Sequence, residues 1–270
     1  MRRPHALTPL EADQYARQGF FLRTGVFSPT QCELLRQAAD QAACAARALA
    51  RGGHSYRLDG NRFVDAGHVT IQFEHGADSE LVRVIEPVQE LDARLDHLLD
   101  DARIAEPMRG IIGQEDIALW TAKLNIKSPR EGSGFRWHQD SPYWIHDCSH
   151  VDLLPNVMVT FDDASADNGC LRLIPGSHRK GCLPGTEDGT QLQGFFTRTD
   201  CFDESRQALM EAPAGSLIFF NPHTVHGSAP NTSDRPRRAI IITCQPGGYP
   251  TLKSKTLRPI KPGTSNPAGG

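Results

Sequence analysis

The first half of the chain carries apolar residues at helical spacing. Between residues 29 and 51, apolar side chains return every three or four positions, which is typical of one face of an amphipathic helix. Two stretches, 8–11 and 28–31, place Ser or Thr directly before Pro, with Glu or Gln three positions after the hydroxyl residue. This combination marks a capped helix start, so we expect helices that begin near residues 9 and 29.

Residues 52–112 are less regular. The stretch 52–78 shows no clear period and contains many turn-forming residues, so we expect an irregular loop with one short strand. A loop of this length often serves as a lid or binding segment, and its mixture of aromatic and polar side chains suits a pocket wall; the alternative is a plain surface connection. We expect helix again over 79–112, with breaks at Pro87 and Pro107.

From residue 117 onward the pattern changes to short β-rich runs. Turn-forming residues separate these runs, which are 117–126, 156–161, 170–174, 215–220 and 238–244. Strands that follow helices along the chain favour an antiparallel sandwich with helices packed on one side. We therefore expect one domain over 1–258, with a helical part over 1–115 and a β core over 116–245, and a disordered tail over 259–270.

Composition narrows the class of protein. Of the 270 residues, 39% are hydrophobic and 23% charged, with a formal net charge of −3. These values suit a soluble globular domain and give no electrostatic support for binding nucleic acid or an anionic membrane. No apolar run approaches the roughly 18 residues of a spanning helix, and the first residues lack the apolar segment of a secretory signal. Seven cysteines without a C-x-x-C pair favour reduced thiols in the cytoplasm.

The candidate chemistry begins with His138 and Asp140, in the stretch SGFRWHQDSPYW. In a strand, side chains two positions apart lie on the same face, about 7 Å from each other, so this pair can share one metal ion. His226, which follows the run GSLIFF, is the natural third ligand. Two histidines and one carboxylate form the facial set of non-haem Fe(II) oxygenases, whereas zinc more often takes a tetrahedral set.

The same residues also allow an ordinary interpretation. An isolated H-x-D occurs by chance in many proteins, and the chain contains eleven histidines. We expect His146, His150, His178 and His223 to be hydrogen-bonding loop residues rather than ligands. The metal hypothesis therefore depends on a further feature of the chain.

That feature is the stretch SDRPRRAIII. A 2-oxoglutarate co-substrate of an iron site needs a fixed cation for its distal carboxylate, and the planar fork of arginine suits a carboxylate. Arg237 begins the β-rich run and shares a face with Ala239, whereas Arg238 points the other way. Arg235 lies in the turn before Pro236, so Arg237 is the preferred candidate.

Four stretches together resemble the phytanoyl-CoA dioxygenase family of Fe(II)- and 2-oxoglutarate-dependent oxygenases, with motif similarity to its ectoine-hydroxylase branch. They are KLNIKSPREGSGFRWHQDSPYW, NVMVTFDDASADNGCLRLIPGSH, GSLIFFNPHTVHGS and RPRRAIII, and they occupy much of the chain between residues 123 and 243. The resemblance implies a mainly β fold with packed helices, built on a double-stranded β-helix, the jelly-roll or cupin-like core.

The resemblance also implies roles for individual positions. The expected iron ligands are His138, Asp140 and His226, and the expected 2-oxoglutarate contacts are Arg237, Ser228, Asn125 and Phe135. The expected substrate contacts are Trp144, an aromatic residue of the ectoine-hydroxylase pattern, and Tyr56 and Phe73 from the stretch 52–78. His178 and Arg172, in a hairpin of the family, are expected to be structural.

The implied activity is that of a dioxygenase, an oxidoreductase that uses Fe(II), 2-oxoglutarate and O₂. The expected reaction is hydroxylation of an unactivated C–H bond of a small molecule, with release of succinate and CO₂. Halogenating relatives carry Ala or Gly at the position of Asp140, so the carboxylate favours hydroxylation. Desaturation, epimerisation, cyclisation and peroxidation use the same cofactors and stay open, as does a non-catalytic metal-binding jelly-roll protein.

Overall fold

The fold was analysed in a computed structural model, which describes residues 3–76 and 78–262. Its strands are β1 Phe20–Arg23, β2 His54–Leu58, β3 Asn61–Ala66, β4 Val69–Phe73, β5 Val82–Glu86, β6 Ile117–Lys127, β7 Phe135–His138, β8 Asn156–Thr160, β9 Leu171–Leu173, β10 Ala208–Leu209, β11 Leu217–Phe220, β12 His226–Ser228 and β13 Arg237–Pro246. They form two antiparallel sheets, a large one in the order β1-β11-β8-β13-β6-β5-β4-β3-β2 and a small one in the order β10-β9-β12-β7.

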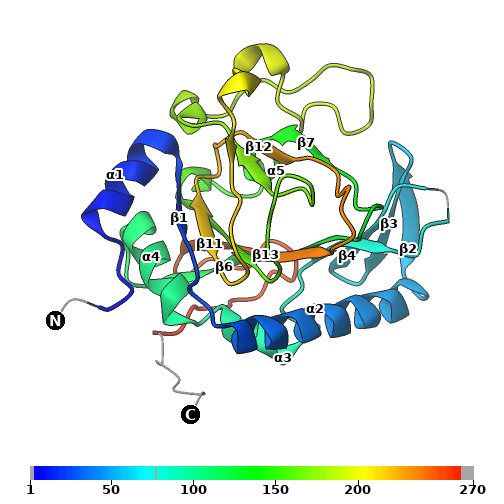
Figure 1. Cartoon of the computed structure of the whole chain (residues 1–270), viewed down its shortest axis with the longest axis horizontal. Coiled ribbons are helices and arrows are strands. Elements are labelled where there is room, and N and C mark those ends of the chain that lie inside the picture. Colours follow the sequence, from blue (N-terminus) through cyan, green and yellow to red (C-terminus); the bar gives the residue numbers. More distant parts are fainter. Residues whose placement is uncertain (1–2, 77, 263–270) are drawn as a thin grey trace.

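The helices lie outside the two sheets. They are α1 Pro9–Gln18, α2 Pro29–Ala50, α3 Ala93–Leu98, α4 Ala102–Ile112 and α5 Ser141–Trp144, with short 3₁₀ turns η1 Val151–Leu153, η2 Ser177–Lys180, η3 Thr199–Cys201 and η4 Glu204–Arg206. The long helix α2 runs beneath the large sheet (Figure 1) and buries one face, which includes Leu35, Ala38 and Ala42. Thr8 and Ser28 both form the expected capping boxes.

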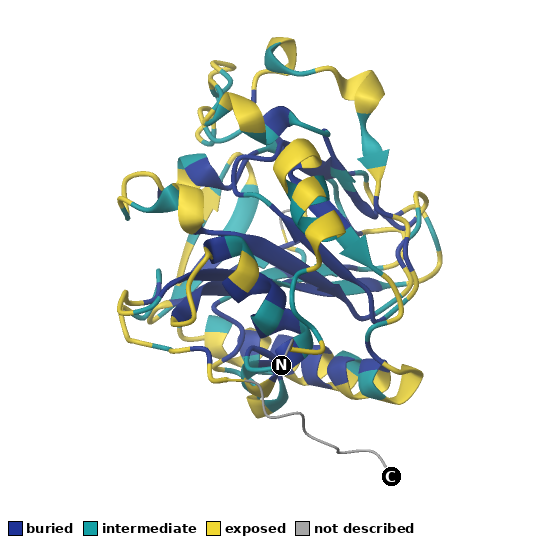
Figure 2. Cartoon of the chain, turned by 90° about the vertical axis from the view of Figure 1, so that its left-hand side faces the viewer, coloured by how far each residue is buried: buried dark blue, intermediate teal, exposed yellow. Residues whose placement is uncertain are grey.

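Alternate side chains of the central strands enter two different cores. In β11, Leu217 and Phe219 join the core shared with the helices, whereas Ile218 and Phe220 join the core between the sheets. Strands buried on both faces need continuous apolar sequences, which explains the unbroken run over 217–220. The buried residues gather in these sheets, while exposed residues occupy the loops and outer helix faces (Figure 2). A jelly-roll core covered by helices on one side is therefore the fold, as the sequence predicts.

The segment expected to be an irregular loop is a regular meander. Strands β2, β3 and β4 pair in sequence and extend the large sheet at its far edge (Figure 1). The hairpin turn between β2 and β3 is Asp59-Gly60, with φ of +48° and +80°, as two-residue hairpins require. The expectation of a loop over 52–78 is wrong, because polar residues on the pocket face obscure the alternation of a strand.

Two further expectations for the N-terminal part need correction. The helix expected over 79–112 begins with a strand, β5, which pairs with β4 and β6. Pro107 lies inside α4 rather than ending it. The part over 1–115 thus contributes five strands to the sheet as well as four helices within the described residues.

The C-terminal segment returns to the core. Pro259 bridges to Ala118, the backbone N–H of Leu119 donates to the carbonyl of Arg258, and Ile260 is buried. The expected disordered tail over 259–270 is therefore wrong at its start, and its remaining part, 263–270, lies outside the described residues. Of the helices described, none combines the length and apolarity that membrane crossing requires.

Candidate active site

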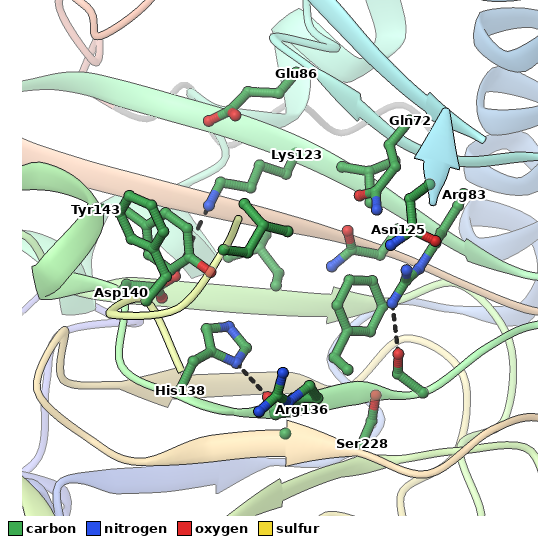
Figure 3. A pocket seen from close by; sticks show the side chains of 18 of the residues that line it. Gln72, Arg83, Glu86, Lys123, Asn125, Arg136, His138, Asp140, Tyr143 and Ser228 are labelled. Atoms are coloured by element: carbon green, nitrogen blue, oxygen red, sulfur yellow. Dashed lines mark hydrogen bonds and ion pairs between the residues drawn. The ribbon is translucent and has the colours of Figure 1, made fainter. Parts of the chain in front are cut away.

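A cavity of about 460 Å³ is lined by residues of both sheets, within the size range of small-molecule sites. Its lining comes from β2 to β6, β8 and β13 of the large sheet and from β7, β9 and β12 of the small sheet, with further residues near 143, 192–196 and 253. In Figure 3, Glu86 and Lys123 lie on one side of this cavity, and His138 and Ser228 lie on the other.

Strand pairing in the small sheet brings the two expected histidine ligands together. His226 in β12 lies opposite His138 at the end of β7, and their ring centroids are 4.1 Å apart. Asp140 follows β7 at the start of α5 with a helical backbone, so the pair does not lie in one strand as expected. Its Oδ2 is 3.7 Å from Nε2 of His226, and one ligand atom of each residue lies within 4.8 Å of the others.

Backbone carbonyls orient both histidine rings. Nδ1 of His138 is 2.7 Å from the carbonyl oxygen of Arg136, and Nδ1 of His226 is 2.9 Å from that of Thr224. A carbonyl only accepts, so each Nδ1 carries the proton and each Nε2 keeps a free lone pair. Burial and the neighbouring His226 lower the pKa of His138 to about 3. His138 is therefore neutral over the physiological range, as a metal ligand must be.

Asp140 is held as a carboxylate by polar neighbours. Its Oδ2 accepts a hydrogen bond from Asn156 at 3.0 Å, and the amide oxygen of Asn156 accepts from Thr243 at 2.6 Å. The ammonium of Lys123 lies 3.8 Å from Oδ1. Burial alone raises the pKa of Asp140, but Lys123 and the two histidines hold it below its usual value. The carboxylate is thus ionised and fixed in place.

The donor set fits a divalent metal ion. Two imidazoles and one fixed carboxylate converge without a thiolate, which structural zinc sites favour. Three ligands on one side of an ion leave the remaining positions to co-substrate and oxygen, as in non-haem Fe(II) sites. His138, Asp140 and His226 are therefore the residues that would hold iron.

Arg237 supplies a buried cation in the same cavity. It is 2% exposed, and one of its terminal nitrogens donates to the carbonyl of Gly169 at 3.1 Å. Its Nε is buried without a hydrogen-bond partner in the described structure, and burial lowers the pKa of Arg237 to about 10. A buried guanidinium without a carboxylate partner is costly unless a ligand supplies one, so Arg237 fits the distal carboxylate of 2-oxoglutarate.

The other expected co-substrate contacts line the same cavity. Ser228, Asn125 and Phe135 are all lining residues, and Phe135 lies opposite Ser228 in the small sheet. Sequence reasoning missed Arg83, whose guanidinium lies 4.0 Å from the centroid of the Phe135 ring. Arg83 donates to the carbonyl of Gly134 at 2.5 Å. No local signal marks Arg83, because its strand was expected to be helix.

Lys127 is a second residue that sequence reasoning missed. It is 0% exposed, lies opposite Arg237 in the large sheet, and donates from Nζ to the carbonyls of Ser133 and Ala229. Burial and the charge of Arg237 lower its pKa to about 6. The alternation of β6 places Lys127 on the same face of the strand as Asn125, although Lys127 itself lies outside the cavity lining, so the sequence contained a usable signal.

The three expected substrate contacts have different locations. Tyr56 lines the cavity, as predicted. Phe73 is 0% exposed and belongs to the main core, because Gln72 takes the pocket face of β4. Trp144 is 1% exposed and packs in a separate cluster with Trp120. Phe73 and Trp144 are outside the cavity lining and are not proposed as substrate contacts.

Of the four histidines expected to be hydrogen-bonding loop residues, His150, His178 and His223 make such hydrogen bonds, whereas the expectation for His146 stays a prediction. His178 pairs with the carbonyl of Ala16, and His150 with the side chain of Gln245. His223 connects Ser141, next to Asp140, with Asp152 through its two ring nitrogens. His223 thereby links the segment that carries His226 to the segment that carries Asp140, although His223 is not itself a candidate metal ligand.

Two segments form the outer wall of the cavity. The rings of Tyr143 and Phe195 stack with centroids 4.5 Å apart. The turn residue Asp59 binds the opposing loop, because its carboxylate accepts from the backbone N–H groups of Gln191 at 2.6 Å and Leu192 at 2.9 Å. The β2–β3 hairpin is thus joined directly to residues 191–192 at the cavity.

A jelly-roll core with a two-histidine, one-carboxylate cluster defines the class of cupin-like proteins with a candidate non-haem metal site. The family model described as phytanoyl-CoA dioxygenase matches residues 15–239. The chain therefore belongs to the phytanoyl-CoA dioxygenase family.

Individual relatives share only part of their length with this chain. A probable alpha-ketoglutarate-dependent hypophosphite dioxygenase of Stutzerimonas stutzeri is 30% identical over 186 residues, which are 66% of this chain and 63% of that protein. An ectoine dioxygenase of Bordetella bronchiseptica is 32% identical over 203 residues, 68% of this chain and 62% of that one. The chain thus spans somewhat less than two thirds of both relatives.

The fold is also shared with a solved structure. The apoform of EctD from S. alaskensis superposes with a TM-score of 0.68 at 21% identity, over 91% of this chain and 80% of that one. At this level of identity the comparison concerns the fold, and it agrees with the two-sheet core described above.

Proposed function

We propose that the protein is an Fe(II)- and 2-oxoglutarate-dependent dioxygenase that hydroxylates an unactivated C–H bond of a small molecule. The observation that carries this proposal is the position of two complementary features in one cavity. His138, Asp140 and His226 offer three ligand atoms within 4.8 Å of one another, and Arg237 offers a buried cation without a carboxylate partner among residues 3–76 and 78–262. Family membership and the named relatives support the same conclusion.

In this proposal each side chain has a defined task. The two imidazole Nε2 atoms and the carboxylate of Asp140 hold the iron, and the guanidinium of Arg237 with the hydroxyl of Ser228 holds the distal carboxylate of 2-oxoglutarate. When bound, iron and 2-oxoglutarate supply oxygen activation, in which 2-oxoglutarate is converted to succinate and CO₂. Asn156 and the carbonyls behind the histidines keep the ligands in place.

The cavity wall contributes by excluding water. Tyr143, Phe195 and Phe196 are aromatic lining residues close to His138. An apolar wall limits the access of water and of stray reductants to the reacting atoms. The aromatic residues around the H-x-D motif thus have a protective role in the proposed reaction.

The test measures 2-oxoglutarate turnover and iron binding separately. Purified protein with Fe(II), O₂ and 2-oxoglutarate should form succinate, at least slowly without substrate. His138→Ala, Asp140→Ala and His226→Ala should abolish succinate formation and weaken Fe(II) binding while the fold survives, because the core packs without the ion. His97→Ala, at an exposed position of α3, is the matched control.

Two results would contradict this proposal. One is wild-type protein that binds Fe(II) and folds but consumes no 2-oxoglutarate, which would favour a non-catalytic binding protein. The other is a triad variant with normal activity. Product mass distinguishes hydroxylation, which adds one oxygen atom, from desaturation, epimerisation or cyclisation, which do not.

The net charge and the state of the cysteines support a proposal for the class of substrate and for the cellular compartment. We propose a small-molecule substrate rather than nucleic acid or a membrane surface, in line with a net charge of −3. All seven cysteines are free, which suits a reducing cytoplasm.

A further inference from the structure

A row of polar side chains crosses the large sheet at one end of the cavity. We call this face of the large sheet the cavity floor. In the large sheet, Thr70 of β4 lies opposite Glu86 of β5, and the neighbouring strand β6 contributes Lys123. The row continues through the apolar residues Ile241 of β13 and Met158 of β8. The floor is therefore polar toward β4 and apolar toward β8.

Glu86 is a cavity-lining carboxylate without an ion pair. Its side chain accepts a hydrogen bond from the hydroxyl of Thr121 at 2.6 Å, and it lines the cavity. Over the described ranges, no Lys, Arg or His nitrogen lies within 4.0 Å of it. The ammonium of Lys123 lies 3.8 Å from Asp140. Burial lowers the pKa of Lys123, but the charges of Glu86 and Asp140 together raise it, so Lys123 lies near both carboxylates without a direct contact to Glu86.

Lys253 is a cavity-lining cation without an ion pair. It reaches the cavity from the segment after β13, where the backbone N–H of Leu252 donates to the carbonyl of Trp120. Its Nζ donates to the hydroxyl of Thr70 at 3.1 Å, and no carboxylate lies within 4.0 Å of it in the part of the chain that the structure describes. By contrast Lys255, two positions on, points elsewhere and pairs with Asp147 at 3.9 Å.

Thr70 connects these two charges. Its hydroxyl accepts from Lys253 and donates to the carboxylate of Asp65 at 2.8 Å. Thr70 also lies opposite Glu86 in the strand pair, yet Glu86 and Lys253 do not pair with each other. Two opposite charges that face one cavity and stay apart provide separate partners for a ligand with both signs of charge. Arg136 and Lys123, by contrast, each have a carboxylate nearby: Arg136 pairs with Asp188, and Lys123 with Asp140.

Lys253 is also remote from the proposed 2-oxoglutarate clamp. Arg237 lies on β13, and Thr70 lies on β4, three strands further along the sheet. Strands are spaced by about 4.8 Å, so this separation is roughly 14 Å across the sheet. The charged groups next to Thr70, which are Glu86 and Lys253, are therefore available to bind a second molecule.

We propose that the substrate is a small dipolar molecule that carries both an amine and an acidic group, such as a carboxylate or phosphonate. Glu86 receives the amine and Lys253 the acidic group, which leaves the carbon skeleton directed along the floor toward His138 and Asp140. This inference rests on the proposed oxygenase function, because it assigns the substrate of that same site. The shared cavity of about 460 Å³ also holds the co-substrate, which restricts the substrate to metabolite size.

The test compares matched probes by equilibrium binding. Calorimetry uses the full chain with 2-oxoglutarate and redox-inert Ni(II) in place of Fe(II), without oxygen. The dipolar probes are 2-aminoethylphosphonate, L-proline and 4-aminobutyrate. Each is matched with an acid-only probe (ethylphosphonate, cyclopentanecarboxylate, butyrate) and an amine-only probe (ethylamine, pyrrolidine, butylamine). We expect at least one dipolar probe to bind about tenfold or more tightly than both of its matched halves.

Variants then show which charged residue binds which group of the probe. Glu86→Gln should weaken the dipolar probe about tenfold and leave the acid-only probe unchanged, whereas Lys253→Met should weaken both. Glu90→Gln and Lys255→Met are matched controls outside the cavity lining, and they should bind like the wild type. Binding of 2-oxoglutarate should stay within about twofold in all four variants.

The proposal is overturned if no dipolar probe binds, if a single-charge probe binds as tightly as its dipolar match, or if the Glu86 and Lys253 variants bind like their controls. Failure of the oxygenase function is seen separately, as absence of 2-oxoglutarate binding and of succinate formation in the wild type. A protein that forms succinate but prefers single-charge probes would refute the substrate class alone.

Discussion

Buried guanidinium groups determine the charge of the part of the cavity that is proposed to bind 2-oxoglutarate. Arg237 and Arg83 line the cavity and are at most 5% exposed, and no carboxylate lies within 4.0 Å of either guanidinium among the described residues. Such groups remain charged inside a protein only where a partner offsets the loss of hydration. A bound dicarboxylate would supply that partner, so co-substrate affinity should depend strongly on these residues.

Arg237→Ala should raise the KM for 2-oxoglutarate about ten- to a hundredfold, because a hydrogen bond to a charged group contributes roughly 1.5–3 kcal/mol. Steady-state succinate formation at varied 2-oxoglutarate measures this effect. Arg235→Ala is the control, since Arg235 is exposed and lies 3.6 Å from Asp167. An equal effect at Arg235 would show that the clamp is assigned to the wrong arginine.

Lys127 should make stability depend on pH. Its pKa is about 6 in the folded protein and about 10.4 in the unfolded chain. Between these values the unfolded chain binds more protons, so the free energy of unfolding rises with pH. Lys127→Met removes this contribution, and from pH 7 to 9 the wild type should gain on the order of 2 kcal/mol relative to the variant. Urea unfolding at both pH values measures the difference; parallel changes in the two proteins would contradict it.

At the scale of elements, the strands with two buried faces were the easiest to predict. The stretches 157–159 and 217–220 within the predicted runs are apolar without interruption, and burial between two cores requires this pattern. The meander β2–β4 was missed because its pocket face carries Tyr56, Asn61, Thr70 and Gln72, which serve a ligand rather than a core. The polar residues of the pocket face thus mask the apolar–polar alternation by which these strands would be recognised.

Asp59, at the tip of the β2–β3 hairpin, should restrict the motion of the opposing loop at residues 191–192. In Asp59→Gly the left-handed backbone of the turn is retained, while the carboxylate that accepts from Gln191 and Leu192 is lost. Hydrogen exchange of these two amides should become about tenfold faster. Amides within the β3–β4 pair serve as the internal control and should exchange as in the wild type. Unchanged exchange at 191–192 would mean that the loop is held by other contacts.

At the scale of the whole molecule, the N-terminal part and the jelly roll share one sheet. β1 pairs with β11, and β5 pairs with β6, so separating the two parts would leave β1 unpaired and would expose one edge of β5, β6 and β11. This integration was not predictable from sequence, because the strand partners of the N-terminal part lie up to 200 positions away. The clustering of the candidate site was more predictable: the proposed iron ligands and Arg237 have motif signals and lie in one cavity, whereas Glu86, Lys253 and Arg83 meet only through the tertiary fold.

The shared sheet predicts a single cooperative unfolding transition. The three tryptophans, Trp120, Trp137 and Trp144, report on the jelly-roll part by fluorescence, whereas the longest described helices, α1, α2 and α4, belong to the N-terminal part. Urea titrations followed by fluorescence and by far-ultraviolet circular dichroism should therefore give the same midpoint. Two separated midpoints would show that the N-terminal part unfolds by itself.

The strand order of the large sheet has a consequence for directed evolution. The proposed iron and 2-oxoglutarate residues lie on β6, β7, β12 and β13 and at the start of α5, whereas Thr70, Gln72, Glu86 and Lys253 lie on β4, β5 and the segment after β13. Substitutions at separated positions without shared partners act additively. Glu86 shares the neighbour Lys123 with Asp140, so a mutant library confined to Thr70, Gln72 and Lys253 should retarget the protein to new compounds while the proposed oxygen chemistry is inherited.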